Sequence, residues 1–135
     1  MTEPRVPSEV SDDLKSCEEL STVADFDAVV AESFKRPVMI LKHSDSCGRS
    51  EHAMETVFRE LEGWAHGVKD VSCRVVIVQE RRGLSDAIEQ RLRVRHETPQ
   101  LILIRNGRVV WHASHWGITD SAMRRALADA SDSGS

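Results

Sequence analysis

The stretch "ETPQLILIRNGRVVWHAS", residues 97–114, constrains the fold most strongly. Two runs rich in apolar and β-branched residues flank Asn106 and Gly107, a dipeptide that readily takes the two positive φ angles of a type I′ turn. The stretch therefore predicts a hairpin of two antiparallel strands. Thr98 and Pro99 precede its first strand, and two interpretations stay open: a cis peptide bond in a tight loop, or a trans proline that merely begins the strand.

The rest of the chain alternates between helical and strand patterns. Apolar residues at helical spacing predict one helix from Asp25 to the residue before Pro37, another from about 47 to 64, and two more over "LSDAIEQRL" and "TDSAMRRALADA", the last capped by Thr119. The apolar runs in "VMILK" and "CRVVIVQE" predict strands that are buried on both faces, and "EELSTV" predicts a short edge strand. The first helix is expected to bury its apolar residues, Phe26, Val29, Val30 and Phe34.

This order of elements predicts an α/β protein with a thioredoxin-like fold, in which a β-α-β half is joined through a helix to a β-β-α half. Such a fold has a central mixed β-sheet flanked by helices. We expect the domain to span residues 16–130, between a flexible lead-in at 1–15 and a disordered tail at 131–135. In this layout the loop with Thr98 and Pro99 lies beside the start of the helix from 47.

Composition argues against several classes of function. The net charge of −4 disfavours a basic nucleic-acid-binding surface, and apolar runs of at most four residues disfavour a membrane span. The N-terminus has no apolar segment typical of a secretory signal. Three widely spaced cysteines without a C-x-x-C pair argue against a disulfide framework and a zinc ribbon, so we expect a reducing cytoplasm.

The stretch "KHSDSCGRSEH", residues 42–52, carries the candidate chemistry. Cys47 lies between a predicted strand and a predicted helix, where unpaired backbone N–H groups and the helix dipole favour the thiolate over the thiol. Lys42, His43 and Arg49 can add positive charge nearby. Because the thiolate is the attacking species in disulfide exchange, this context favours a nucleophilic role; the alternative is an ordinary, unreactive cysteine near a helix cap.

Ser50 occupies the position three residues after Cys47, where a dithiol enzyme keeps its resolving cysteine. A hydroxyl there can hydrogen-bond the thiolate but cannot close an internal disulfide. An exchange enzyme of this kind therefore needs an external thiol to complete its cycle. Cys73 opens an apolar strand and is expected to be buried and inert, whereas Cys17 is a minor candidate for a resolving or regulatory thiol.

The histidines do not predict a metal site. His112 and His115 would point to opposite faces if both lay on one strand, and no carboxylate–histidine pattern with metal-ligand spacing accompanies His43. Trp111 and Trp116 are expected to pack against the domain rather than to form a platform for a ligand.

Two blocks, "LKHSDSCGRS" and "VRHETPQLILIRNGRVVWHASHWGIT", resemble the YtxJ-type monothiol bacilliredoxins, small thioredoxin-fold proteins of bacteria that use bacillithiol. The resemblance covers residues of about 18 to 130. It implies a thiol–disulfide oxidoreductase that removes bacillithiol from S-bacillithiolated proteins, with bacillithiol or another low-molecular-weight thiol as co-substrate and no bound cofactor. It also implies Cys47 as the nucleophile, Thr98 and Pro99 as the substrate-binding loop, and an active-site environment made of Lys42, His43, Ser44, Gly48, Arg49 and Ser50.

One departure from that family follows the cysteine directly. The family commonly has a proline directly after the cysteine, whereas this chain has Gly48 and then Arg49, a difference that bears on the pKa of the cysteine and on its preferred thiol. The resulting "CGRS" is similar to the C-G-F-S of monothiol glutaredoxins, which can hold an iron–sulfur cluster, so a cluster carrier is an alternative. A second alternative is a non-catalytic, thioredoxin-like module that binds a protein partner.

Overall fold

The computed structural model describes residues 17–44, 52, 55–57, 59 and 71–133. Its strands are β1 (Cys17–Glu19), β2 (Val38–His43), β3 (Ser72–Ile77), β4 (Gln100–Arg105) and β5 (Arg108–Ser114). Its helices are α1 (Val23–Glu32), α3 (Arg82–Leu92), the short 3₁₀ helix η1 (His115–Gly117) and α4 (Asp120–Ser133). Residues 52, 55–57 and 59 are helical and fall within the segment predicted as a helix over 47–64.

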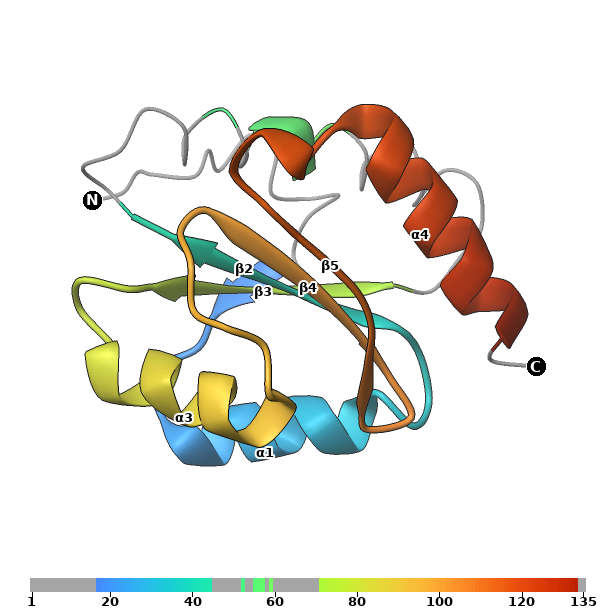
Figure 1. The fold of residues 1–135 in the computed structure, drawn as a ribbon. Helices are drawn as coiled ribbons and strands as arrows, with labels where there is room; N and C mark the ends of the chain where they lie inside the picture. Colours follow the sequence, from blue (N-terminus) through green and yellow to red (C-terminus); the bar gives the residue numbers. More distant parts are fainter. Residues whose placement is uncertain (1–16, 45–51, 53–54, 58, 60–70, 134–135) are drawn as a thin grey trace.

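The strands form one mixed sheet in the order β1-β3-β2-β4-β5. β2 and β3 run parallel, as do β1 and β3, whereas β4 is antiparallel to both β2 and β5. Figure 1 shows α1 and α3 on one face of the sheet and α4 on the other. A β-α-β half and a β-β-α half thus share a central mixed sheet, as the sequence predicted.

The core consists of two apolar clusters, one on each face of the sheet. On the α4 face, Met39 and Leu41 of β2 pack with Met123 and Leu127. On the α1 and α3 face, alternate residues of the same strand pack with side chains of both helices, among them Phe26 and Ile88. Every residue of β2 is buried, which confirms the prediction of a doubly covered strand.

The predicted hairpin joins β4 and β5. Asn106 and Gly107 have φ values of 57° and 76°, the left-handed values that the dipeptide predicted. Their backbone N–H groups donate to the carbonyl and the hydroxyl of Ser33 at 2.7 and 2.8 Å, so the turn is tied to the end of α1. A bulge between the Leu103–Trp111 and Ile104–Val109 pairs interrupts the ladder farther along.

Three details differ from the sequence-based expectations. α1 ends at Glu32, so Phe34 lies beyond the helix and is 59% exposed, with its ring over Gly107 instead of in the core. β1 ends at Glu19 because Thr22 and Asp25 form a capping box that starts α1. α4 extends to Ser133, while the domain boundaries proposed at 15 and 130 stay predictions.

The predicted cap of the last helix is confirmed, since the Thr119 hydroxyl accepts a hydrogen bond from the backbone N–H of Ala122 at 3.2 Å. Among the described residues, no helix is long and apolar enough to cross a membrane.

Candidate functional site

The candidate site lies at the carboxyl end of β2, where the chain leads toward Cys47. Gln100, the first residue of β4, pairs with Lys42 in the antiparallel ladder. The Thr98–Pro99 peptide bond directly before β4 is cis, so the first of the two interpretations is confirmed. One step beyond that ladder pair in the same register, Pro99 faces His43. The loop with Thr98 and Pro99 therefore lies beside the end of β2.

The central residues of the predicted site, Cys47, Gly48, Arg49 and Ser50, lie outside the described residues. The described part of the predicted environment consists of Lys42, His43 and Ser44. His43 is buried and its backbone carbonyl accepts from Val78 at 2.9 Å, while Ser44 is half-buried. Since side chains alternate along a strand, Lys42 and His43 point to opposite faces of the sheet.

Lys42 is fully buried on the face covered by α3. Its ammonium donates to the backbone carbonyl of Ser85 at 3.2 Å and lies 3.2 Å from Nδ1 of His96. The Ser85 hydroxyl also lies 3.2 Å from that nitrogen. Because an ammonium only donates, Nδ1 of His96 accepts, which places the imidazole proton on Nε2.

The surroundings of Lys42 and His96 lower the pKa of both side chains. Burial lowers the pKa of Lys42 to about 8, although the carboxylates of Glu89 and Asp86 favour its charged form. Burial, and then the charge of Lys42, lower the pKa of His96. Glu89 also accepts a hydrogen bond from the backbone N–H of His96 at 3.0 Å. The loop that leads to Pro99 is therefore fixed to both α3 and β2.

Sequence reasoning placed Lys42 near the cysteine but missed its partner. Lys42 and His96 are 54 positions apart in the chain, and no periodicity connects them. The available signal was a lysine inside a doubly buried strand, because a buried ammonium requires acceptors from neighbouring elements.

Trp116 contradicts the expectation that it packs. It is 69% exposed, because β5 ends at Ser114 and the chain turns outward at His115, whose φ is 54°. Trp111 is half-buried against the core on the α4 face, as predicted. His115 thus belongs to η1 and not to the strand of His112, and its Nδ1 lies 3.7 Å from Glu97.

The described part of the chain also bears on the predictions for a metal site and for the two other cysteines. There, no group of three or more His, Cys, Asp or Glu side chains is arranged to hold a metal ion. Cys73 is buried, with no exposed surface, which confirms the expected burial of this thiol. Cys17 opens β1, and its role stays a prediction.

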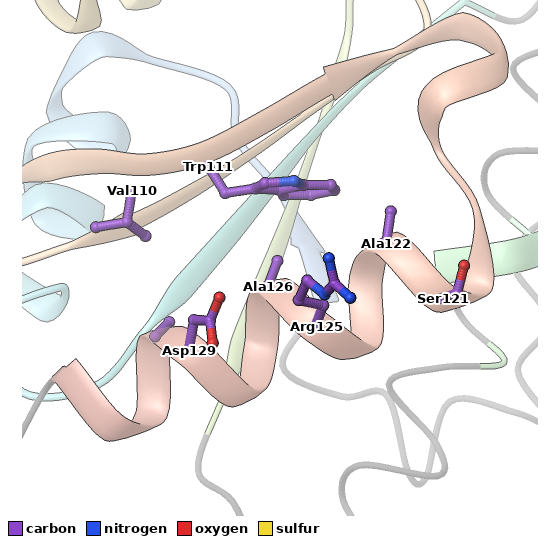
Figure 2. Close-up of a pocket in the computed structure, with 8 residues that line it drawn as sticks. Val110, Trp111, Ser121, Ala122, Arg125, Ala126 and Asp129 are labelled. Atoms are coloured by element: carbon purple, nitrogen blue, oxygen red, sulfur yellow. The ribbon is translucent and has the colours of Figure 1, made fainter.

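A groove of about 520 Å³ lies between β5 and α4. Figure 2 shows the Trp111 indole above α4, with Arg125 extending from the helix toward it. The described residues that line this groove include none of the described residues predicted for exchange chemistry; they are Val110, Trp111, Ser121, Ala122, Arg125, Ala126, Asp129 and Ala130.

Comparisons with known proteins agree with this architecture. The family model described as monothiol bacilliredoxin BrxC matches residues 18–123. A solved structure of a candidate oxidoreductase with a thioredoxin fold is 32% identical, with a TM-score of 0.74, over 84% of this chain and 96% of that one. Thioredoxins from Malassezia sympodialis (16% identity, TM-score 0.68, 85% and 90% covered) and Fasciola hepatica (18%, 0.65, 84% and 98%) share the fold.

Proposed function

Because the chain belongs to the BrxC family of monothiol bacilliredoxins, thiol–disulfide oxidoreductases, we propose that it removes bacillithiol from protein mixed disulfides through Cys47. The observation that supports this most directly is the position of the cis-Pro99 loop. The ladder sets it beside the end of β2, four residues before Cys47 in the sequence. A loop there can pair with the extended backbone around a modified cysteine of a substrate protein, through the backbone of Thr98.

The proposed reaction has two exchange steps. The Cys47 thiolate attacks the bacillithiol sulfur, a bond forms between these two sulfurs, and the substrate's disulfide bond breaks. The substrate sulfur leaves as a thiolate and takes a proton from solvent. A second low-molecular-weight thiolate then attacks the bacillithiol sulfur bound to Cys47, releasing the Cys47 thiolate and a small disulfide. Because Cys47 returns as a thiolate, the external thiol is the net reductant: its sulfur is oxidised into the small disulfide as the substrate sulfur is reduced to a thiol.

Ser50 and Arg49 have distinct proposed roles. With serine three residues after Cys47, no disulfide between positions 47 and 50 can form to compete with the external thiol. The Arg49 guanidinium adds positive charge close in sequence to the thiolate, which favours the attacking form. A reducing cytoplasm fits this chemistry, since small thiols there stay available for the second step.

Mass spectrometry tests the proposal. The reduced protein is incubated with a single-cysteine protein that carries bacillithiol, with the glutathione-modified protein in parallel. We expect the bacillithiol mass on the Cys47 peptide and a freed thiol on the substrate. Cys47→Ser should give neither product, while Cys73→Ser, which alters a buried thiol, should give both.

Absence of an adduct on the wild-type protein from either substrate would contradict the proposal. Visible absorbance after anaerobic purification, together with that absence, would instead support the iron–sulfur carrier. An adduct only with the glutathione-modified substrate would retain the exchange mechanism and change the preferred small thiol.

A further inference from the structure

Trp116 is an exposed aromatic side chain at the end of the sheet where Pro99 lies. With 69% of its surface accessible, it leaves a large apolar area in water. Phe34, the other largely exposed aromatic side chain in the described part of the chain, covers the backbone of Gly107 at the opposite, hairpin end. These two exposed aromatic side chains therefore lie at opposite ends of the sheet, and Trp116 is the one on the side of Pro99.

The backbone around Trp116 is held firmly in place. The N–H of His115 donates to the carbonyl of Pro99 at 3.0 Å, and the N–H of Ile118 donates to the carbonyl of His115 at 3.2 Å. Ile118 itself is buried in the core on the α4 face. His115, with a φ of 54°, adopts a left-handed conformation that is uncommon for residues other than glycine. These contacts fix η1 directly against the cis-proline loop.

The indole also contacts the helical segment that follows Cys47. The ring centroids of Trp116 and His52 are 6.5 Å apart and the planes are inclined by 52°, a distance at which aromatic rings attract one another. His52 is five positions after Cys47 in the sequence. Trp116 therefore joins the two segments that the exchange reaction uses, the loop of Pro99 and the helix after the nucleophile.

We propose that Trp116 is a specificity-determining residue that binds an apolar side chain about two residues from the modified cysteine of a protein substrate. The inference rests on the proposed function. A substrate backbone paired along Thr98 runs past η1, because η1 is hydrogen-bonded to Pro99. Tryptophan is among the residue types that most often dominate binding energy in interfaces. The adjacent His115, whose Nδ1 lies 3.7 Å from Glu97, adds a polar neighbour. A small disulfide, which lacks such a side chain, does not reach the indole.

Kinetics with matched substrates test this role. One substrate is a bacillithiolated peptide with leucine two residues from its cysteine, the second has serine there, and the third is the mixed disulfide of bacillithiol with 2-mercaptoethanol. For Trp116→Ala we expect kcat/KM on the leucine peptide to fall by about tenfold or more. On the small disulfide it should stay within about twofold of wild type.

Two further variants serve as controls. Trp116→Phe keeps an aromatic surface and should retain most of the activity on the leucine peptide. Phe34→Ala removes an exposed aromatic ring at the hairpin end and should leave all three rates unchanged.

Three outcomes would overturn the inference. An equal loss on all substrates would mean that Trp116 supports the chemistry or the fold instead of recognition. Unchanged rates on the leucine peptide would mean that the indole contacts no substrate. If the wild-type protein reacts with none of the three substrates, the proposed function itself is wrong. The first two outcomes leave that function intact.

Discussion

At the scale of single residues, Lys42 is unusual because its charged ammonium group lies in the interior of the protein. A buried ammonium loses its hydration, and two carboxylates nearby, Glu89 and Asp86, only partly replace it. Its hydrogen bonds to Ser85 and His96 join β2 to α3 and to the segment before Pro99. An apolar residue of similar shape would fill the same space without the desolvation penalty, so we expect Lys42 to contribute less stability than such a residue would.

We expect Lys42→Met to raise the free energy of unfolding at neutral pH by about 1 kcal/mol. The Ser85 hydroxyl remains within 3.2 Å of Nδ1 of His96, so that nitrogen keeps a donor. Loss of the neighbouring positive charge should also raise the pKa of His96. Urea unfolding measures the first effect, and NMR titration of the His96 ring measures the second.

Lys42→Arg is the matched control, because it keeps the charge and enlarges the side chain, and it should destabilise the protein. If Lys42→Met were instead less stable than wild type, the hydrogen bonds of the ammonium would outweigh its desolvation. The assignment of Lys42 as a destabilising residue would then be wrong.

At the scale of elements, the two ends of the sheet were not equally predictable. The hairpin followed from a local dipeptide, because Asn106 and Gly107 carry their turn geometry in their own backbone preferences. The position of Phe34 did not follow, since it depends on where α1 stops and on the distant Gly107. Trp116 was missed for the same reason: the turn at His115 is set by a hydrogen bond to Pro99, not by periodicity.

Gly107 provides the test of the hairpin. Its φ of 76° disfavours any side chain, and an added Cβ would lie 2.9 Å from Cζ of Phe34. We expect Gly107→Ala to lower the free energy of unfolding by about 1 to 3 kcal/mol. Exchange activity at low temperature should stay near that of wild type, because the turn lies at the end of the sheet opposite Pro99.

Gly83 offers a matched control in the same protein. It lies within α3, and an added Cβ would meet nothing within 4 Å. Gly83→Ala should therefore stabilise the protein by up to about 1 kcal/mol. Equal effects of the two substitutions in thermal unfolding would show that the positive φ of Gly107 does not constrain the hairpin.

At the scale of the whole molecule, the pKa values of Glu32, His96 and Lys42 are all lowered. Burial raises the pKa of Glu32, but hydrogen bonds from Ser72 and Arg36 and the charge of Arg74 outweigh it, so the net pKa is lowered. The pKa values of His96 and Lys42 are lowered as well. In each case the unfolded chain binds more protons than the folded one within a window of pH, and stability rises with pH across that window.

We therefore expect stability to increase from acid to alkaline pH instead of peaking near neutrality. The Glu32 contribution to stability is lost as pH falls below 4.5, the ordinary pKa of a glutamate, and the lowered pKa of His96 costs stability as pH falls below 6.5. Lys42 adds a rise in stability between about pH 8 and pH 10.5, because in this window only the unfolded chain keeps the proton on the lysine. Urea midpoints at about pH 3.5, 5.5, 7 and 9.5 measure this profile, with a reductant present to keep the cysteines reduced.

Lys42→Met separates the alkaline part of this profile from the rest. Without a titrating side chain at that position, the variant should reach a plateau above about pH 8, while its loss of stability in acid should persist because Glu32 and His96 remain. A wild-type maximum near pH 7 with a decline by about pH 9.5 would contradict the prediction. It would mean that the folded chain binds more protons than the unfolded chain at alkaline pH, the opposite of what a lowered Lys42 pKa produces.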